Sequence, residues 1–218
     1  MGSLLGGQCL RAGAFRFFSP TTQPAMALAF SRAGPRVVCS RSIQSASRRC
    51  RHSPQRLHSP AMPHLIRNII GQAEFPRVGY DAVQHGAAIK PPKRPTDMTI
   101  GEIYDWIAAT PGQLHAIGRY QFIPDTLRCV VTKVGAKHSD RFTPVLQDML
   151  ADVLLADAGF RDFVAGDLDQ QKFMNNLAGI WAGLPTLSGR SKYHGVAGNW
   201  ATITLAHFRS EVAKIHPS

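Results

Sequence analysis

The chain has 218 residues, of which 44% are hydrophobic and 18% are charged. It is long enough to bury one sizeable core and too apolar on average for a disordered protein. The formal net charge of +11 is concentrated at the start, because residues 1–62 hold nine arginines and no Asp or Glu, leaving 16 Lys+Arg against 14 Asp+Glu afterwards. This near balance argues against a nucleic-acid-binding face in the later part of the chain.

The first segment, residues 1–62, is rich in Ser, Pro, Arg and Ala and shows no sustained hydrophobic period. Such a composition predicts a disordered basic segment, which is a leader, a flexible extension or an over-extended start upstream of Met26 or Met62. Its apolar run at 25–30 is too short to cross a bilayer, so we expect no stable membrane insertion. Residues 63–218 are predicted to form one domain, active as a monomer.

The domain is predicted to begin with a helix over 64–70, where four aliphatic residues form one stripe and Glu74 follows at the end. Residues 86–96, with three prolines, are typical of an extended loop. Thr99 and Glu102 have the spacing of a capping box and predict the next helix start.

Further helices are predicted over 126–134, 143–155 and 169–181 and around 205–215. The first of these takes Asp125 as its N-cap. The second has the strongest amphipathic pattern, and its predicted core face is Leu146, Met149, Leu150, Val153 and Leu154. Strand signals are scarce, so we expect only a small sheet within 80–95. The predicted fold class is α+β, predominantly α-helical.

The stretch 115–126 combines a glycine, adjacent polar groups and a helix entry through Pro124. Gly118 permits a positive φ, and Arg119, Tyr120 and Gln121 follow it directly. This pattern fits both an ordinary entry from a loop into a helix and a loop that holds polar groups at a binding cleft.

Three segments in the same order resemble the lysozyme superfamily, most closely the lambda-type phage endolysins and related muramidases. Residues 118–124 with Thr126 are similar to the glycine-aromatic-glutamine segment of that family. Ala73 and Glu74, followed by 79–81 and Gly86, resemble the segment that carries its catalytic glutamate. Residues 176–185 resemble its "NIWASLP" segment.

The resemblance implies a two-lobed lysozyme-like domain with a small irregular β region and with Glu74 as the general acid. Such an acid requires a pKa raised by burial. Asp81 is the candidate for a second carboxylate in a hydrolytic muramidase. The family pattern instead implies single-glutamate lytic transglycosylase chemistry with 1,6-anhydro products. Two non-enzymatic alternatives remain: a catalytically silent glycan-binding module, and an interaction protein whose active part is the basic segment 1–62.

Substrate-binding candidates are the polar and aromatic residues of these segments and of a later loop: Gln121, Tyr120, Tyr80, Arg119 and Tyr193. Trp181 lies on an apolar stripe, which favours packing over sugar stacking. No HExxH or paired CxxC spacing is present, so we expect no metal and no cofactor. The expected partner is the peptidoglycan glycan strand. The expected place of action is the cell wall, with the compartment left open.

Overall fold

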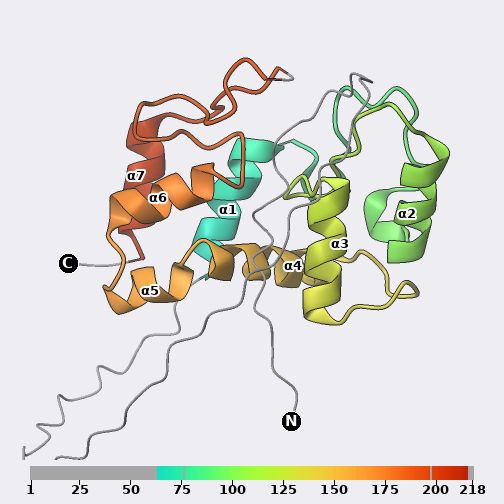
Figure 1. Cartoon of the computed structure of the whole chain (residues 1–218), viewed down its shortest axis with the longest axis horizontal. Helices are drawn as coiled ribbons and strands as arrows, with labels where there is room; N and C mark the ends of the chain where they lie inside the picture. The colour runs from blue at the N-terminus through green and yellow to red at the C-terminus, as the bar shows by residue number, and fades with distance from the viewer. Residues whose placement is uncertain (1–62, 76, 197, 216–218) are drawn as a thin grey trace, which may run out of the picture. The chain divides into compact units, whose positions relative to one another are not determined.

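The computed structural model describes residues 63–75, 77–196 and 198–215, and this part of the chain is predominantly helical. Figure 1 shows α1 between the α6–α7 pair and α3. Residues 1–62 lie outside the described residues, and with them the prediction made for that segment. The elements in chain order are α1 (Pro63–Glu74), the 3-10 helices η2 (Gly79–Asp81) and η3 (Pro95–Asp97), α2 (Ile100–Ala109), α3 (Pro124–Val134), α4 (Pro144–Asp157), α5 (Phe160–Ala165), α6 (Gln170–Ala178) and α7 (Leu205–Ala213).

The small sheet expected within 80–95 is absent from the described residues, which contain only isolated β-bridges. Val83 pairs with Ile117, and Ile117 in turn pairs with Phe122. The three prolines of the segment have no N–H group to donate to a ladder, so the pairing does not extend. The prediction of a β region was therefore wrong for this part of the chain, while its predominantly helical character is confirmed.

The helix starts follow the capping chemistry in most cases. Thr99 and Glu102 form the expected capping box at the start of α2, and Thr143 caps α4 through the backbone N–H of Leu146. The predicted cap of α3 was wrong, because that helix begins at Pro124. Its N-cap position falls on an apolar residue, and Asp125 lies inside the first turn, where a carboxylate faces the positive end of the helix.

The buried face of α4 is rotated from the predicted one. Met149 is 48% exposed, whereas Gln147 is fully buried. The residues that face the core also show spacings of three and four, but starting one position later: Gln147, Leu150, Ala151, Leu154 and Leu155. Leu146 is buried at the edge of this face.

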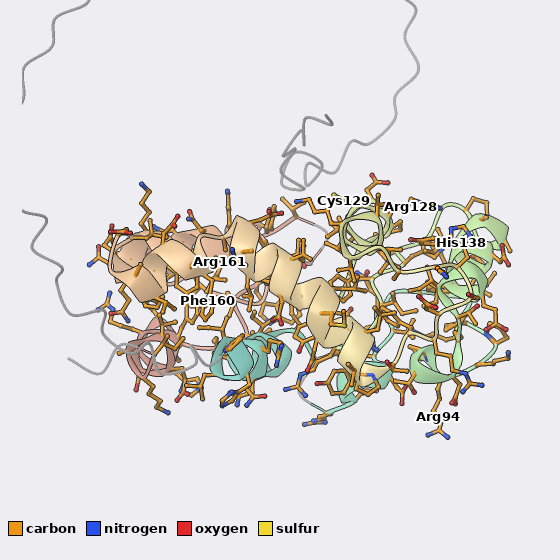
Figure 2. The ribbon with its side chains drawn as sticks, turned by 90° about the horizontal axis from the view of Figure 1, so that it is seen from below. Arg94, Arg128, Cys129, His138, Phe160 and Arg161 are labelled. Carbon is orange, nitrogen blue, oxygen red and sulfur yellow. The ribbon has the colours of Figure 1, made fainter. Side chains whose placement is uncertain are left out.

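Aromatic side chains join neighbouring helices around the core. On one side, Phe160 of α5 and Phe163 both contact Phe173 of α6, the second pair stacked at 4.5 Å between ring centroids. On the other side, the guanidinium of Arg128, which Figure 2 labels, lies 4.4 Å from the ring centroid of Tyr104 and so links α3 to α2. The short helix α5 was not expected from the sequence.

Helix α1 lies at the centre of this arrangement, since it packs against both α4 and α7. Three of the four aliphatic residues predicted to form its stripe, Ile66, Ile69 and Ile70, are buried, and the fourth, Leu65, is half-buried. None of the helices described here is both long and apolar enough to span a lipid bilayer.

Candidate active site

Glu74 is the last residue of α1, and the structure places it against a segment more than a hundred residues further along the chain. Its Oε1 accepts a hydrogen bond from the backbone N–H of Gly183 at 2.9 Å. A Cβ atom at Gly183 would lie 2.4 Å from the carbonyl oxygen of Ala73, far inside contact distance. Only glycine therefore lets the two backbones approach closely enough to form this hydrogen bond.

The surroundings of Glu74 favour its neutral form. Burial raises the pKa of the Glu74 carboxyl group to about 7, against the opposing effect of the Gly183 N–H. The C-terminal end of α1 adds a negative partial charge that also disfavours a carboxylate. The residue is only half-buried over its whole surface, so desolvation acts on the carboxyl group while part of the side chain stays accessible.

The second oxygen of Glu74, Oε2, accepts no hydrogen bond from any described residue. Because Oε1 is engaged by a donor, the proton of the neutral acid resides on Oε2. The arrangement is that of a carboxylic acid with one oxygen held by a hydrogen bond and the other without a hydrogen-bond partner among the described residues.

Thr202, from a third segment of the chain, forms hydrogen bonds to the residues at the junction between the end of α1 and Gly183. Its hydroxyl donates to the carbonyl oxygen of Ala73, and its backbone N–H donates to the carbonyl oxygen of Gly183 at 3.0 Å. The end of α1, Gly183 and Thr202 are thus tied together by hydrogen bonds around Glu74.

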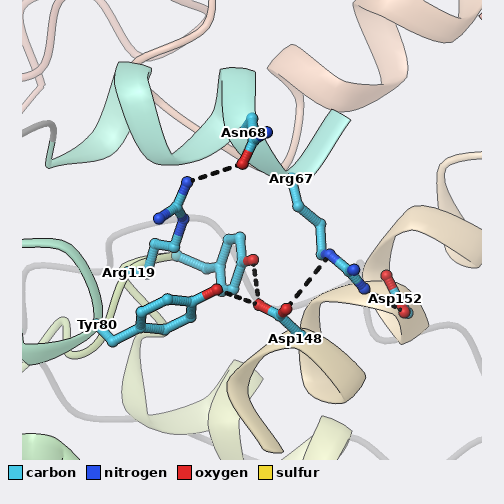
Figure 3. Close-up of polar contacts among 7 residues, drawn as sticks. Arg67, Asn68, Tyr80, Arg119, Asp148 and Asp152 are labelled. Carbon is cyan, nitrogen blue, oxygen red and sulfur yellow. Dashed lines mark hydrogen bonds and ion pairs between the residues drawn. The ribbon is translucent and has the colours of Figure 1, made fainter. Parts of the chain in front are cut away.

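Arg119 lies on the face of α1 that also carries Glu74. Residues Arg67, Gly71 and Glu74 follow one another at spacings of four and three, which places them on one helix face. A Cβ atom at Gly71 would lie 2.5 Å from Arg119 Nε, so the guanidinium crosses the helix at the glycine. It donates to Asn68 Oδ1 at 3.1 Å (Figure 3).

Asp148 of α4 collects the hydroxyl groups of two predicted binding residues. Its Oδ1 accepts from Tyr80 at 2.9 Å and from Tyr120 at 2.6 Å (Figure 3). Burial, followed by the hydrogen bond to Asp148, raises the pKa of both tyrosines. Arg67 approaches Asp148 at 3.7 Å and pairs with Asp152 at 2.8 Å.

Tyr120 is a core residue with 1% of its surface exposed. Its ring meets those of Tyr80 and Phe122 edge-on and so has no open face for a sugar. The sequence-based prediction that Tyr120 binds substrate directly was therefore wrong. Tyr80 is half-buried, and the guanidinium of Arg119 lies 5.1 Å from its ring centroid.

Gln121 closes a tight turn with the glycine before it. Its φ of 48° is positive, and its side-chain Nε2 donates to the carbonyl oxygen of Gly118 at 2.9 Å. The residue remains half-buried. One side of its amide is thus used to hold the turn, which leaves its oxygen for other partners.

Gln147 organises this turn, and the sequence-based analysis missed it. Its buried amide accepts from the backbone N–H of Arg119 at 2.9 Å and donates to the carbonyl oxygens of Tyr80 and Phe142, each at 3.0 Å. The available signal was its place in the pattern Gln147, Leu150, Ala151, Leu154 and Leu155, where a polar residue occupies a core position.

Asp81 and Tyr193 hold loops. Asp81 Oδ1 accepts from the backbone N–H and the hydroxyl of Thr96 at 2.9 and 2.6 Å. The Tyr193 hydroxyl donates to the carbonyl oxygen of Gly179 at 2.6 Å. Trp181 is 3% exposed and donates to the carbonyl oxygen of Tyr120, as its predicted packing role requires.

Within the described residues, no group of three or more His, Cys, Asp or Glu side chains is arranged to hold a metal ion. Comparison with known proteins adds no relative: no family model, curated protein or solved structure matches this chain.

Proposed function

We propose that the chain is a peptidoglycan-degrading enzyme of the lysozyme-like type, with Glu74 as its acid. It cleaves the β-1,4 bond between N-acetylmuramic acid and N-acetylglucosamine by lytic transglycosylase chemistry. The observation that carries the proposal is the carboxyl group of Glu74, whose pKa of about 7 leaves about half of it protonated in neutral solution, where an ordinary glutamate is almost fully ionised. Its position also coincides with the catalytic glutamate of the family that the sequence resembles.

In the proposed reaction, Glu74 Oε2 gives its proton to the glycosidic oxygen as the bond to the anomeric carbon breaks. The carboxylate then takes the proton of the muramoyl 6-hydroxyl, whose oxygen attacks the anomeric carbon. Glu74 is protonated again at the end, and no water is consumed. The N–H of Gly183 holds Oε1 through both steps and stabilises the transient carboxylate.

The neighbours of Glu74 suggest how the glycan is held. Arg119 crosses the same face of α1 one helical turn before the acid. In this role its guanidinium attracts the peptide-stem carboxylates of peptidoglycan. Gln121 lies with Arg119 in the tight turn that follows Gly118, and it offers its amide oxygen to a sugar hydroxyl or acetamido N–H. Tyr120 and Gln147 serve to position this turn from the interior.

The test is digestion of purified peptidoglycan with analysis of the soluble fragments by mass spectrometry. We expect muropeptides that end in 1,6-anhydromuramic acid and are lighter than hydrolysed ones by the mass of one water. Glu74→Gln is expected to abolish them while leaving the fold intact, because the amide is nearly isosteric but cannot act as an acid.

Glu211→Gln is the matched control, since it makes the same change in a glutamate of α7 that pairs with Lys214. Reducing-end products lost in Asp81→Asn would instead establish a hydrolytic muramidase with Asp81 as the second carboxylate. Sugar binding without cleavage by the wild type would indicate a silent glycan-binding module. Undiminished cleavage by Glu74→Gln would remove Glu74 from the mechanism.

A further inference from the structure

Trp200 is a large aromatic residue left open to solvent. It is 62% exposed, whereas Trp106 and Trp181 are 5% and 3% exposed. The two buried indoles donate to backbone carbonyl oxygens at 3.1 and 3.2 Å. The Trp200 indole N–H meets no acceptor in the described part of the chain. Most of the surface of this residue, together with its indole donor, can therefore meet a ligand.

The chain leads directly from Trp200 to the Glu74 site. Thr202, two residues on, donates to the carbonyl oxygens of Ala73 and Gly183. Two residues of extended chain span at most about 7 Å. The backbone of Trp200 therefore lies within the length of one or two sugar rings from Thr202, which bonds to the residues around Glu74.

Backbone hydrogen bonds also join Gly195, Val196 and Asn199, just before Trp200. The N–H of Gly195 donates to the carbonyl oxygen of Asn199 at 3.1 Å, and the N–H of Asn199 donates to that of Val196 at 3.0 Å. Val196 is itself 43% exposed. An exposed aromatic residue joined by two residues of chain to the hydrogen bonds around Glu74 fits an oligosaccharide, whose rings combine C–H faces with polar edges.

We propose that Trp200 is a stacking platform for a sugar ring of the glycan strand, in a subsite next to the bond cleaved at Glu74. The C–H face of an N-acetylhexosamine ring packs on the indole, and the indole N–H donates to a hydroxyl or acetamido oxygen. This inference rests on the proposed glycan-cleaving function. It assigns binding, and no step of the reaction, to Trp200.

The direct test is a titration with the tetrasaccharide of N-acetylglucosamine in the Glu74→Gln background, where no turnover occurs. Trp200 is the most exposed of the three indoles, so bound sugar should shift tryptophan emission to shorter wavelength and protect it from iodide quenching. Trp200→Ala should weaken binding about tenfold, equivalent to about 1.4 kcal/mol. Trp200→Phe should retain most of the affinity because it keeps an aromatic face.

Leu187→Ala is the matched control, an exposed apolar residue of the same long loop whose backbone N–H is held by Asn175. It should leave the affinity unchanged. With peptidoglycan as substrate and Glu74 intact, Trp200→Ala should raise KM and leave kcat nearly unaltered, as loss of uniform binding requires.

The outcomes separate the two proposals. Unchanged affinity and KM in Trp200→Ala, with cleavage by the wild type, would overturn the subsite and leave the enzymatic function standing. Sugar binding that depends on Trp200, without cleavage by the wild type, would support the subsite and reject the enzyme. Neither binding nor cleavage would reject both.

Discussion

The acidity of Glu74 predicts a pH dependence of folding stability that one isosteric substitution removes. In the folded chain the pKa is raised from 4.5 to about 7. Between these values the unfolded chain has released its proton while the folded chain keeps it, so unfolding releases a proton and becomes easier as pH rises. The stabilisation of the protonated acid is fully present below pH 4.5 and is lost as pH rises through about 7.

The magnitude follows from the size of the shift. One pKa unit corresponds to about 1.4 kcal/mol, so the free energy of unfolding of the wild type should lose about 3 kcal/mol through Glu74 across this window. Glu74→Gln cannot titrate, and its amide oxygen still accepts from the Gly183 N–H. The variant should therefore gain about 3 kcal/mol relative to the wild type between about pH 4 and about pH 8.

Urea denaturation of both proteins at a series of pH values measures the difference directly. Glu211→Gln, which removes a surface carboxylate paired with Lys214, is the control and should keep the wild-type slope in this window. Parallel stability profiles for the wild type and Glu74→Gln would refute the reasoning, since they would mean that folding leaves the proton affinity of Glu74 unchanged. In activity assays the same group should give a loss of rate above about pH 7, where the acid has no proton to donate.

Three further substitutions test the contacts around the site. Gly183→Ala should destabilise the fold by about 1–3 kcal/mol in urea denaturation, because its Cβ would overlap the Ala73 carbonyl oxygen; full stability would show that the junction adapts. Gln147→Leu should cost about 3 kcal/mol or more by leaving three backbone groups, one of them fully buried and two partly buried, without their partner. Gln171→Leu, at an exposed position of α6, should change the free energy of unfolding by no more than about 0.5 kcal/mol; equal effects of the two substitutions would contradict a buried role for Gln147. Gly71→Ala should lower glycan turnover by displacing the guanidinium above it, and should not give the stabilisation of about 1 kcal/mol usual for this change in a helix. A stabilisation of about 1 kcal/mol by Gly71→Ala, with unchanged glycan turnover, would show that the Arg119 guanidinium does not lie over Gly71.

Local signals predicted the helices well where side chain and backbone interact within a few residues. The capping box of Thr99 and Glu102 and the aliphatic stripe of α1 are of this kind, and both are present. The short helix α5 was missed because a segment of six residues carries too little periodicity to stand out. Met149 was assigned to the core because two overlapping stripes fit α4, and only the packed structure selects between them.

The site was predictable only in part for a similar reason. The resemblance pointed to Glu74, and the sequence placed it at the end of a helix. Its hydrogen-bond partner Gly183 lies 109 positions away, and no local pattern encodes such a pairing. Gln147 and Asp148 were passed over because polar residues on a helix are usually solvated, whereas here the core requires them for the backbone of one turn and the hydroxyls of two tyrosines.

The long sequence separation between Glu74 and its partners has a consequence for the newly made protein. The helix that ends in Glu74 leaves the ribosome well before Gly183 and Thr202 have been synthesised, and at about 5–20 residues per second the delay is roughly 5–20 s. Until the later segment docks, the carboxyl group remains hydrated and ionised like any surface glutamate. A chain that is unfinished, or is truncated before residue 183, thus lacks the buried carboxyl group with a raised pKa, and the acid proposed for catalysis arises only when the fold is complete.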